Sequence, residues 1–68
     1  MLKRSTERGS RHMLYIVNDI TKQVYWNQAF TISSLEDASY WMASHGCREV
    51  RRKQVGNNRY IFVKERAQ

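Results

Sequence analysis

The length of 68 residues leaves room for one small domain of marginal stability, because a chain this short buries only roughly 60% of its unfolded surface. A single cysteine excludes an internal disulfide. The hydrophobic share of 41% is too high for a disordered chain, and no apolar run approaches the ~20 residues of a membrane span. We therefore expect a small cytoplasmic domain with no membrane partner.

Positive charge is the strongest compositional signal. Lys and Arg total 12 against 6 Asp and Glu, and the net charge of +6 favours anionic partners. Residues 1–12 carry four of the basic residues and lack any apolar periodicity. We predict that residues 1–12 are a disordered basic tail or an expression leader, and that residues 13–68 form a single α+β domain.

Two strands are predicted at the start of this domain. Met13 to Val17 is apolar and rich in strand formers, and Asn18-Asp19 after it favours a turn. Residues 24–32 form the second strand, with Val24, Trp26 and Gln28 on one face and Tyr25 on the other. Strict alternation fails from Ala29 onward, which indicates an irregularity there. We expect an antiparallel hairpin over a loop of four to six residues.

A helix is predicted over residues 34–45. Ser33 and Glu36 fit a capping box, which satisfies two free backbone N–H groups at the start of a helix. Gly46 is suited to the left-handed position that ends a helix. One face of the helix collects the residues at 3- and 4-residue steps: Leu35, Ala38, Trp41, Met42 and His45.

Two further strands follow, at residues 47–55 and 59–65, with a turn at residues 56–58 between them. The fold class is therefore α+β, in β-β-α-β-β order. We expect a four-stranded, mostly antiparallel sheet with one helix packed on one face and the other face at least partly open.

Basic and aromatic residues gather in the last two strands and form the candidate binding site. Alternation places Arg51 and Lys53 on one face, and Arg48 and Arg52 on the other. Aromatic rings among cations on an open sheet stack bases and hold phosphates. The alternative is that the cations protect an edge strand from aggregation and the rings belong to the core. The predicted nucleic-acid-binding residues are Arg48, Arg51, Arg52, Lys53, Arg59, Tyr60, Phe62 and Lys64, with Tyr15 and Tyr25 as further aromatic candidates.

Catalysis and cofactor binding find no support in the sequence. His45 and Cys47 lack a second pair of ligands for a zinc site, and structural roles explain them better. Glu36 and Asp37 are adjacent, so they face different directions and suit a helix N-terminus better than acid–base chemistry. We predict no enzymatic activity, no catalytic residues, no metal and no cofactor.

The sequence thus favours a small basic nucleic-acid-binding protein for DNA or RNA, of the type common in phages and mobile elements. The alternative is a protein-binding modulator or inhibitor that docks on an acidic surface of a larger host enzyme. It would use the same basic strand together with Trp41 or Tyr40 as an aromatic anchor. A homodimer paired through a sheet edge is a third expectation.

Overall fold

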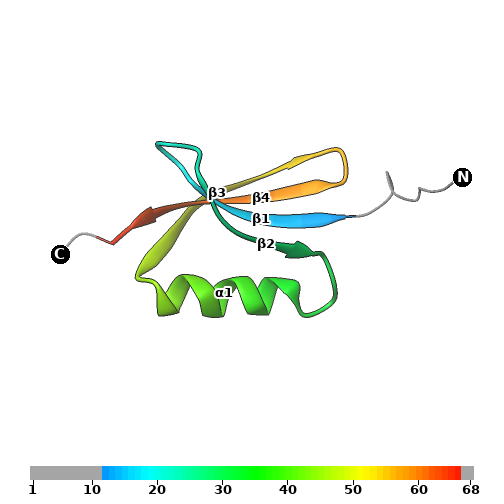
Figure 1. Cartoon of the computed structure of the whole chain (residues 1–68), viewed down its shortest axis with the longest axis horizontal. Helices are drawn as coiled ribbons and strands as arrows, with labels where there is room; N and C mark the ends of the chain where they lie inside the picture. The colour runs from blue at the N-terminus through cyan, green and yellow to red at the C-terminus, as the bar shows by residue number, and fades with distance from the viewer. Residues whose placement is uncertain (1–11, 67–68) are drawn as a thin grey trace, which may run out of the picture.

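The computed structural model describes residues 12–66. Four strands and one helix follow one another as β1 (Met13–Asn18), β2 (Val24–Ala29), α1 (Ser34–Ser44), β3 (Cys47–Val55) and β4 (Asn58–Glu65) (Figure 1). The predicted α+β class and β-β-α-β-β order are confirmed. The expected disordered tail covers residues 1–12. Residues 1–11 lie outside the described part of the chain, and His12 is its first described residue. The carbonyl of His12 accepts a hydrogen bond from the Phe30 amide at 2.8 Å, so the pairing of β1 with β2 continues one residue before Met13.

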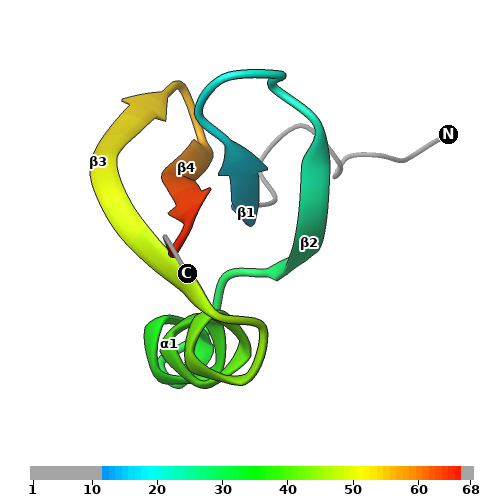
Figure 2. The same ribbon diagram turned by 90° about the vertical axis from the view of Figure 1, so that its left-hand side faces the viewer.

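The strands form one mixed sheet in the order β2-β1-β4-β3. Both outer pairs, β1–β2 and β3–β4, are antiparallel hairpins, whereas the two central strands β1 and β4 run parallel. Seen end-on, α1 lies below the sheet, with the edge strands β3 and β2 on either side of it (Figure 2). The helix has 11 residues, and within the described residues no helix is long and apolar enough to cross a bilayer.

The main core lies between α1 and the two central strands. Ile16 of β1 and Val63 of β4 are fully buried there, and they pack with Ala38 and Met42 of the helix. Half-buried aromatic side chains close the margins of this core, namely Tyr25, Trp26, Phe30 and Trp41. One helix therefore covers one face of the sheet, as the sequence predicts.

The start of the helix is stabilised by Ser34, and the predicted capping box of Ser33 and Glu36 does not form. Ser33 occupies the N-cap position, but its side chain makes no capping hydrogen bond. The Ser34 hydroxyl is fully buried instead. It accepts hydrogen bonds from the Thr31 amide at 2.6 Å and the Gln28 side chain at 3.1 Å, and it donates to the Ala29 carbonyl at 3.1 Å. The loop before the helix is thus tied to the end of β2 by a buried serine.

The last helical residue is Ser44, one residue earlier than predicted. Gly46 follows as the left-handed residue that stops the helix, as the sequence predicts. Gly46 has a φ of 66°, in the left-handed region that glycine adopts without steric cost. The ring of His45 stacks on Trp41 at 4.0 Å, and His45 Nδ1–H donates to the Trp41 carbonyl at 2.9 Å. The Trp41 carbonyl also accepts the backbone N–H of His45 at 3.0 Å, so the ring and the backbone of His45 share one acceptor in the last turn.

The second strand differs from its prediction in length and phase. β2 ends at Ala29 and not at residue 32, and the irregularity lies at Tyr25, where the register with β1 shifts. Trp26 pairs with Ile16 on the helix side, whereas Val24 pairs with Val17 on the opposite side. The prediction that Val24 shares a face with Trp26 is therefore wrong, because the bulge inserts one residue between them.

The loop between β1 and β2 spans five residues, 19–23, within the predicted length. Asn18 organises it, because its side-chain oxygen accepts hydrogen bonds from the amides of Ile20 and Thr21, both at 2.8 Å. Lys22 has a φ of 67° in the same loop. The ammonium group of Lys22 then lies 5.1 Å from the centre of the Phe62 ring, so the loop reaches the face of the sheet that α1 leaves uncovered.

Candidate nucleic-acid interface

The sheet face opposite α1, called the open face below, is defined by the register of the strands. Residues paired across neighbouring strands point to the same side of a sheet, and those one position along a strand point to the other. Tyr60 and Phe62 alternate with the core residues Ile61 and Val63, so both lie on the open face. Their partners are Tyr15 and Val17 in β1 and Lys53 and Arg51 in β3.

A bulge in β3 changes which cations share this face. The pairing with β4 shifts between Glu49 and Arg51, so Val50 is an extra residue. Arg48 consequently pairs with Lys64, which alternation along β4 places on the side of Phe62. The prediction that Arg48 lies opposite Arg51 is therefore wrong, because strict alternation ignores the bulge.

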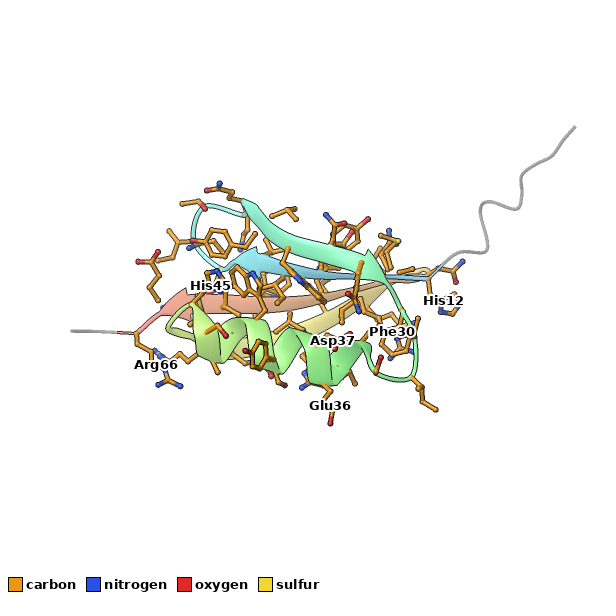
Figure 3. The ribbon with its side chains drawn as sticks, turned by 60° about the horizontal axis from the view of Figure 1, so that its bottom comes forward. His12, Phe30, Glu36, Asp37, His45 and Arg66 are labelled. Atoms are coloured by element: carbon orange, nitrogen blue, oxygen red, sulfur yellow. The ribbon has the colours of Figure 1, made fainter. Side chains whose placement is uncertain are left out.

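Charge is distributed unequally between the two sides of the sheet. The open face carries one carboxylate, Asp19, and five cations: Lys22, Arg48, Arg51, Lys53 and Lys64. The other four carboxylates of residues 12–66 belong to the helix side, namely Glu36 and Asp37 of α1 (Figure 3), Glu49 beside Val63 and Glu65 beside Cys47. Only three cations remain elsewhere in this part of the chain: Arg52, Arg59 and Arg66. The excess positive charge of the described residues is therefore confined to the open face.

Aromatic rings run through the middle of the open face. Tyr15 and Tyr60 lie directly opposite each other on the parallel central strands, and their rings stack with centres 5.0 Å apart and planes 12° from parallel. Both side chains are half-buried, so part of each ring contacts solvent. Phe62 is the next ring along β4, 6.2 Å from Tyr60.

Phe62 differs from the tyrosines because other side chains cover it. The guanidinium of Arg51 lies 4.0 Å from its ring centre and Lys22 lies 5.1 Å away. Asp19 holds both cations, with Arg51 Nε at 3.2 Å and Lys22 Nζ at 3.8 Å. Only 8% of Phe62 is exposed as a result. Phe62 therefore stabilises the open face by packing and offers little surface for stacking a base.

Arg52 and Arg59, two further predicted phosphate ligands, lie on the helix side. Arg52 pairs with the core residue Ile61 and makes two hydrogen bonds to Glu49, at 2.6 and 3.1 Å. These hydrogen bonds raise the pKa of Arg52 above its ordinary value. The guanidinium of Arg59 lies 4.4 Å from the ring centre of Phe30. Neither side chain belongs to the surface that carries the other predicted cations.

A hollow of about 240 Å³ lies beside these two arginines, between the first turn of α1 and the strands β3 and β4. Leu14, Leu35 and Ile61 supply apolar lining, and the side chain of Gln54 adds a polar group. Arg59 Nε is buried here, and within the described residues it has no hydrogen-bond partner. Arg52 also borders the hollow, but Glu49 already neutralises it.

Tyr25, which the sequence offers as a further aromatic of the binding surface, packs toward the helix. Its ring stacks on Trp41 with centres 5.9 Å apart, and its hydroxyl accepts a hydrogen bond from the Asn18 side chain at 2.8 Å. The bulge at this position turns the side chain to the helix side. Tyr15 is thus the one of the two candidates that lies among the cations.

Cys47 and His45 lie on either side of Gly46, where the helix gives way to β3. Cys47 is buried in the main core, and its thiol lies 3.7 Å from the His45 carbonyl. Burial, with a smaller contribution from the negative charge of Glu65, raises the pKa of the thiol. In residues 12–66, no three His, Cys, Asp or Glu side chains gather in a way that could hold a metal ion.

Sequence reasoning missed Lys22 and Asn27 as members of the open face. Asn27 is exposed and pairs with Tyr15. Lys22 reaches Phe62 only because β1 and β4 are neighbours, which places the loop after β1 beside the far end of β4. No local pattern signals either position, since both depend on strand pairing between distant segments.

Comparisons of the chain with models of protein families, with curated proteins and with solved structures found no significant match. What the chain binds must therefore be inferred from the charge and geometry of its surfaces.

Proposed function

We propose that this chain is a small non-enzymatic nucleic-acid-binding protein that holds the phosphate backbone of its ligand on the open face. The observation that carries the proposal is the confinement of the excess charge, with five cations against one carboxylate on that face. A polyanion is attracted by such a one-sided field and gains further affinity when its counterions are released. Arg48, Lys53 and Lys64 make no ion pair within the described residues, so their charges are available to phosphates.

The alternative of a protein-binding modulator needs the basic strand and an aromatic anchor on one surface. Tyr40 is 77% exposed, but it lies on α1, across the sheet from the open face. Trp41 is half-buried between Tyr25 and His45. Because neither anchor adjoins the open-face cations, a single protein partner would have to reach around the sheet. This separation argues against a protein partner anchored by Tyr40 or Trp41.

Self-association through the β3 edge of the sheet is also less favourable than the sequence suggested. β3 is an edge strand of nine residues, and all of its side chains after Cys47 are exposed. Four of these residues are cationic, and pairing with an identical strand would bring like charges together. The cations that attract a polyanion would thus also keep this edge from pairing with a second copy.

Salt-dependent titration of a fluorescent oligonucleotide tests the proposal with two neighbouring cations of β3. Lys53 and Arg52 are adjacent but lie on opposite faces, so Lys53→Ala and Arg52→Ala remove the same charge from different sides of the sheet. We expect Lys53→Ala to make the negative slope of log K against log salt shallower by roughly 0.7–0.9, the value for one phosphate contact. Arg52→Ala should leave the slope unchanged.

A larger change comes from replacing Arg48, Lys53 and Lys64 together by Ala. The negative slope should then become shallower by roughly 2–3, and the affinity for unrelated sequences should decrease to a similar extent. Arg51 is left in place because it packs on Phe62 and its removal would also affect folding. Equal effects of Lys53→Ala and Arg52→Ala, or no binding at low salt by a protein shown to be folded, would overturn the proposal.

A further inference from the structure

One row of side chains crosses the whole open face and contains its exposed rings. Strand pairing aligns Lys53 of β3, Tyr60 of β4, Tyr15 of β1 and Asn27 of β2, which we call the tyrosine row. Lys53 and Asn27 are exposed at its two ends, and the stacked tyrosines lie between them. A cation, two rings and an amide thus follow one another across four strands.

The rows on either side lack an accessible ring. In one of them Phe62 and Val17 are only 8% and 4% exposed, and Arg51 and Lys22 lie over the Phe62 ring. The other contains Met13 and Asn58 on the central strands. The tyrosine row is therefore the place on the open face where a flat apolar group can meet an aromatic surface beside an unpaired cation.

We propose that the tyrosine row binds an unpaired base, so that the ligand of the open face is single-stranded nucleic acid. This inference rests on the proposed function. The flat faces of bases in a duplex are covered by their neighbours, whereas those of a single strand are free to stack on tyrosine. Lys53 is placed to contact a phosphate at one end of the row, and the amide of Asn27 can both donate to and accept from a base edge at the other.

The spacing of the rings determines how a base is held. Stacked bases are about 3.4 Å apart, so a base between two rings would need them roughly 7 Å apart. The centres of Tyr15 and Tyr60 are 5.0 Å apart, which leaves no room between them. The base therefore stacks on a ring face that points away from the other tyrosine. The single-stranded ligand then crosses the sheet along the tyrosine row, from the β3 side toward β2.

Fluorescence anisotropy with three probes tests this inference. Labelled single strands of oligo-dT and oligo-U and a mixed-sequence duplex, each about ten units long, are titrated at low salt. We expect both single strands to bind more tightly than the duplex. Tyr60→Leu should weaken single-strand binding roughly 5- to 150-fold and leave the salt slope and the duplex affinity unchanged.

Two matched variants control for loss of the fold. Tyr60→Phe retains the ring and should bind single strands like the original protein. Tyr40→Leu makes the same change at an exposed position of α1 and should also have no effect. In the unaltered protein, the ring proton resonances of Tyr15 and Tyr60 should shift on addition of oligo-dT while those of Tyr40 do not, a result that needs no substitution.

The outcomes separate the two proposals. If duplex and single strands bind equally, and Tyr60→Leu and the tyrosine resonances show no effect, base stacking is overturned while binding of phosphates by the open face stands. If none of the three probes binds at low salt, the proposed function fails and the inference fails with it.

Discussion

Ser34 is the polar side chain whose removal should most clearly destabilise the domain. Its hydroxyl is fully buried and accepts hydrogen bonds from the Thr31 amide at 2.6 Å and Gln28 Nε2 at 3.1 Å. It also donates to the Ala29 carbonyl at 3.1 Å. Ser34→Ala would leave these partners without the hydroxyl, and one buried polar group without a partner costs about 1–3 kcal/mol.

We expect Ser34→Ala to lower the free energy of unfolding by about 2–3 kcal/mol, because more than one partner loses its hydrogen bond. A domain of this size has a total stability of about 3–8 kcal/mol, so the loss is a large fraction of the whole. The melting temperature should fall by roughly 10–20 °C. Urea unfolding followed by far-UV circular dichroism measures the change, and the m-value should stay constant.

The neighbouring serine provides the control. Ser33 occupies the N-cap position but makes no side-chain capping bond, and its hydroxyl only approaches Thr31 Oγ1 at 3.4 Å. Ser33→Ala should therefore change stability by less than about 0.5 kcal/mol. If Ser33→Ala costs as much as Ser34→Ala, or if Ser34→Ala is neutral, the assignment of the helix start to Ser34 is wrong.

Two further predictions concern the end of α1 and the core cysteine. Gly46→Ala should lower the free energy of unfolding by about 1 kcal/mol because of the positive φ of 66°, and by no more because an added Cβ would meet nothing within 4 Å. Gly46→Asn should cost less, since Asn tolerates this conformation better than Ala. Equal stabilities of the two variants and the original protein in urea would contradict this. Burial raises the pKa of Cys47, so its contribution to stability is fully present below the ordinary thiol pKa and decreases as pH rises above it. Cys47→Ala should therefore lose less stability between neutral and alkaline pH than the original protein, and equal losses in urea unfolding at the two pH values would refute this.

Local patterns in the sequence determined the elements and several of their ends. Side-chain alternation predicted β4, and the polar turn at residues 56–58 marked the hairpin that joins it to β3. Gly46 marked the end of the helix because only glycine adopts a φ of 66° at no steric cost. These features depend on backbone preferences and side-chain periodicity within about ten residues, which the order of residues already specifies.

Tertiary structure alone decided which side chains meet on the open face. Tyr15 lies beside Tyr60 only because the central strands pair in parallel across 45 positions of the chain, and no local signal sets that register. The extra residue Val50 brings Arg48 to this face, since a shift of one position in a strand reverses the side to which every later residue points. The sequence by itself therefore specified the charges and rings of the candidate site. Strand pairing decided which of them share a surface. Pairing is not visible in local sequence, because it depends on contacts that distant segments make only when the core has formed.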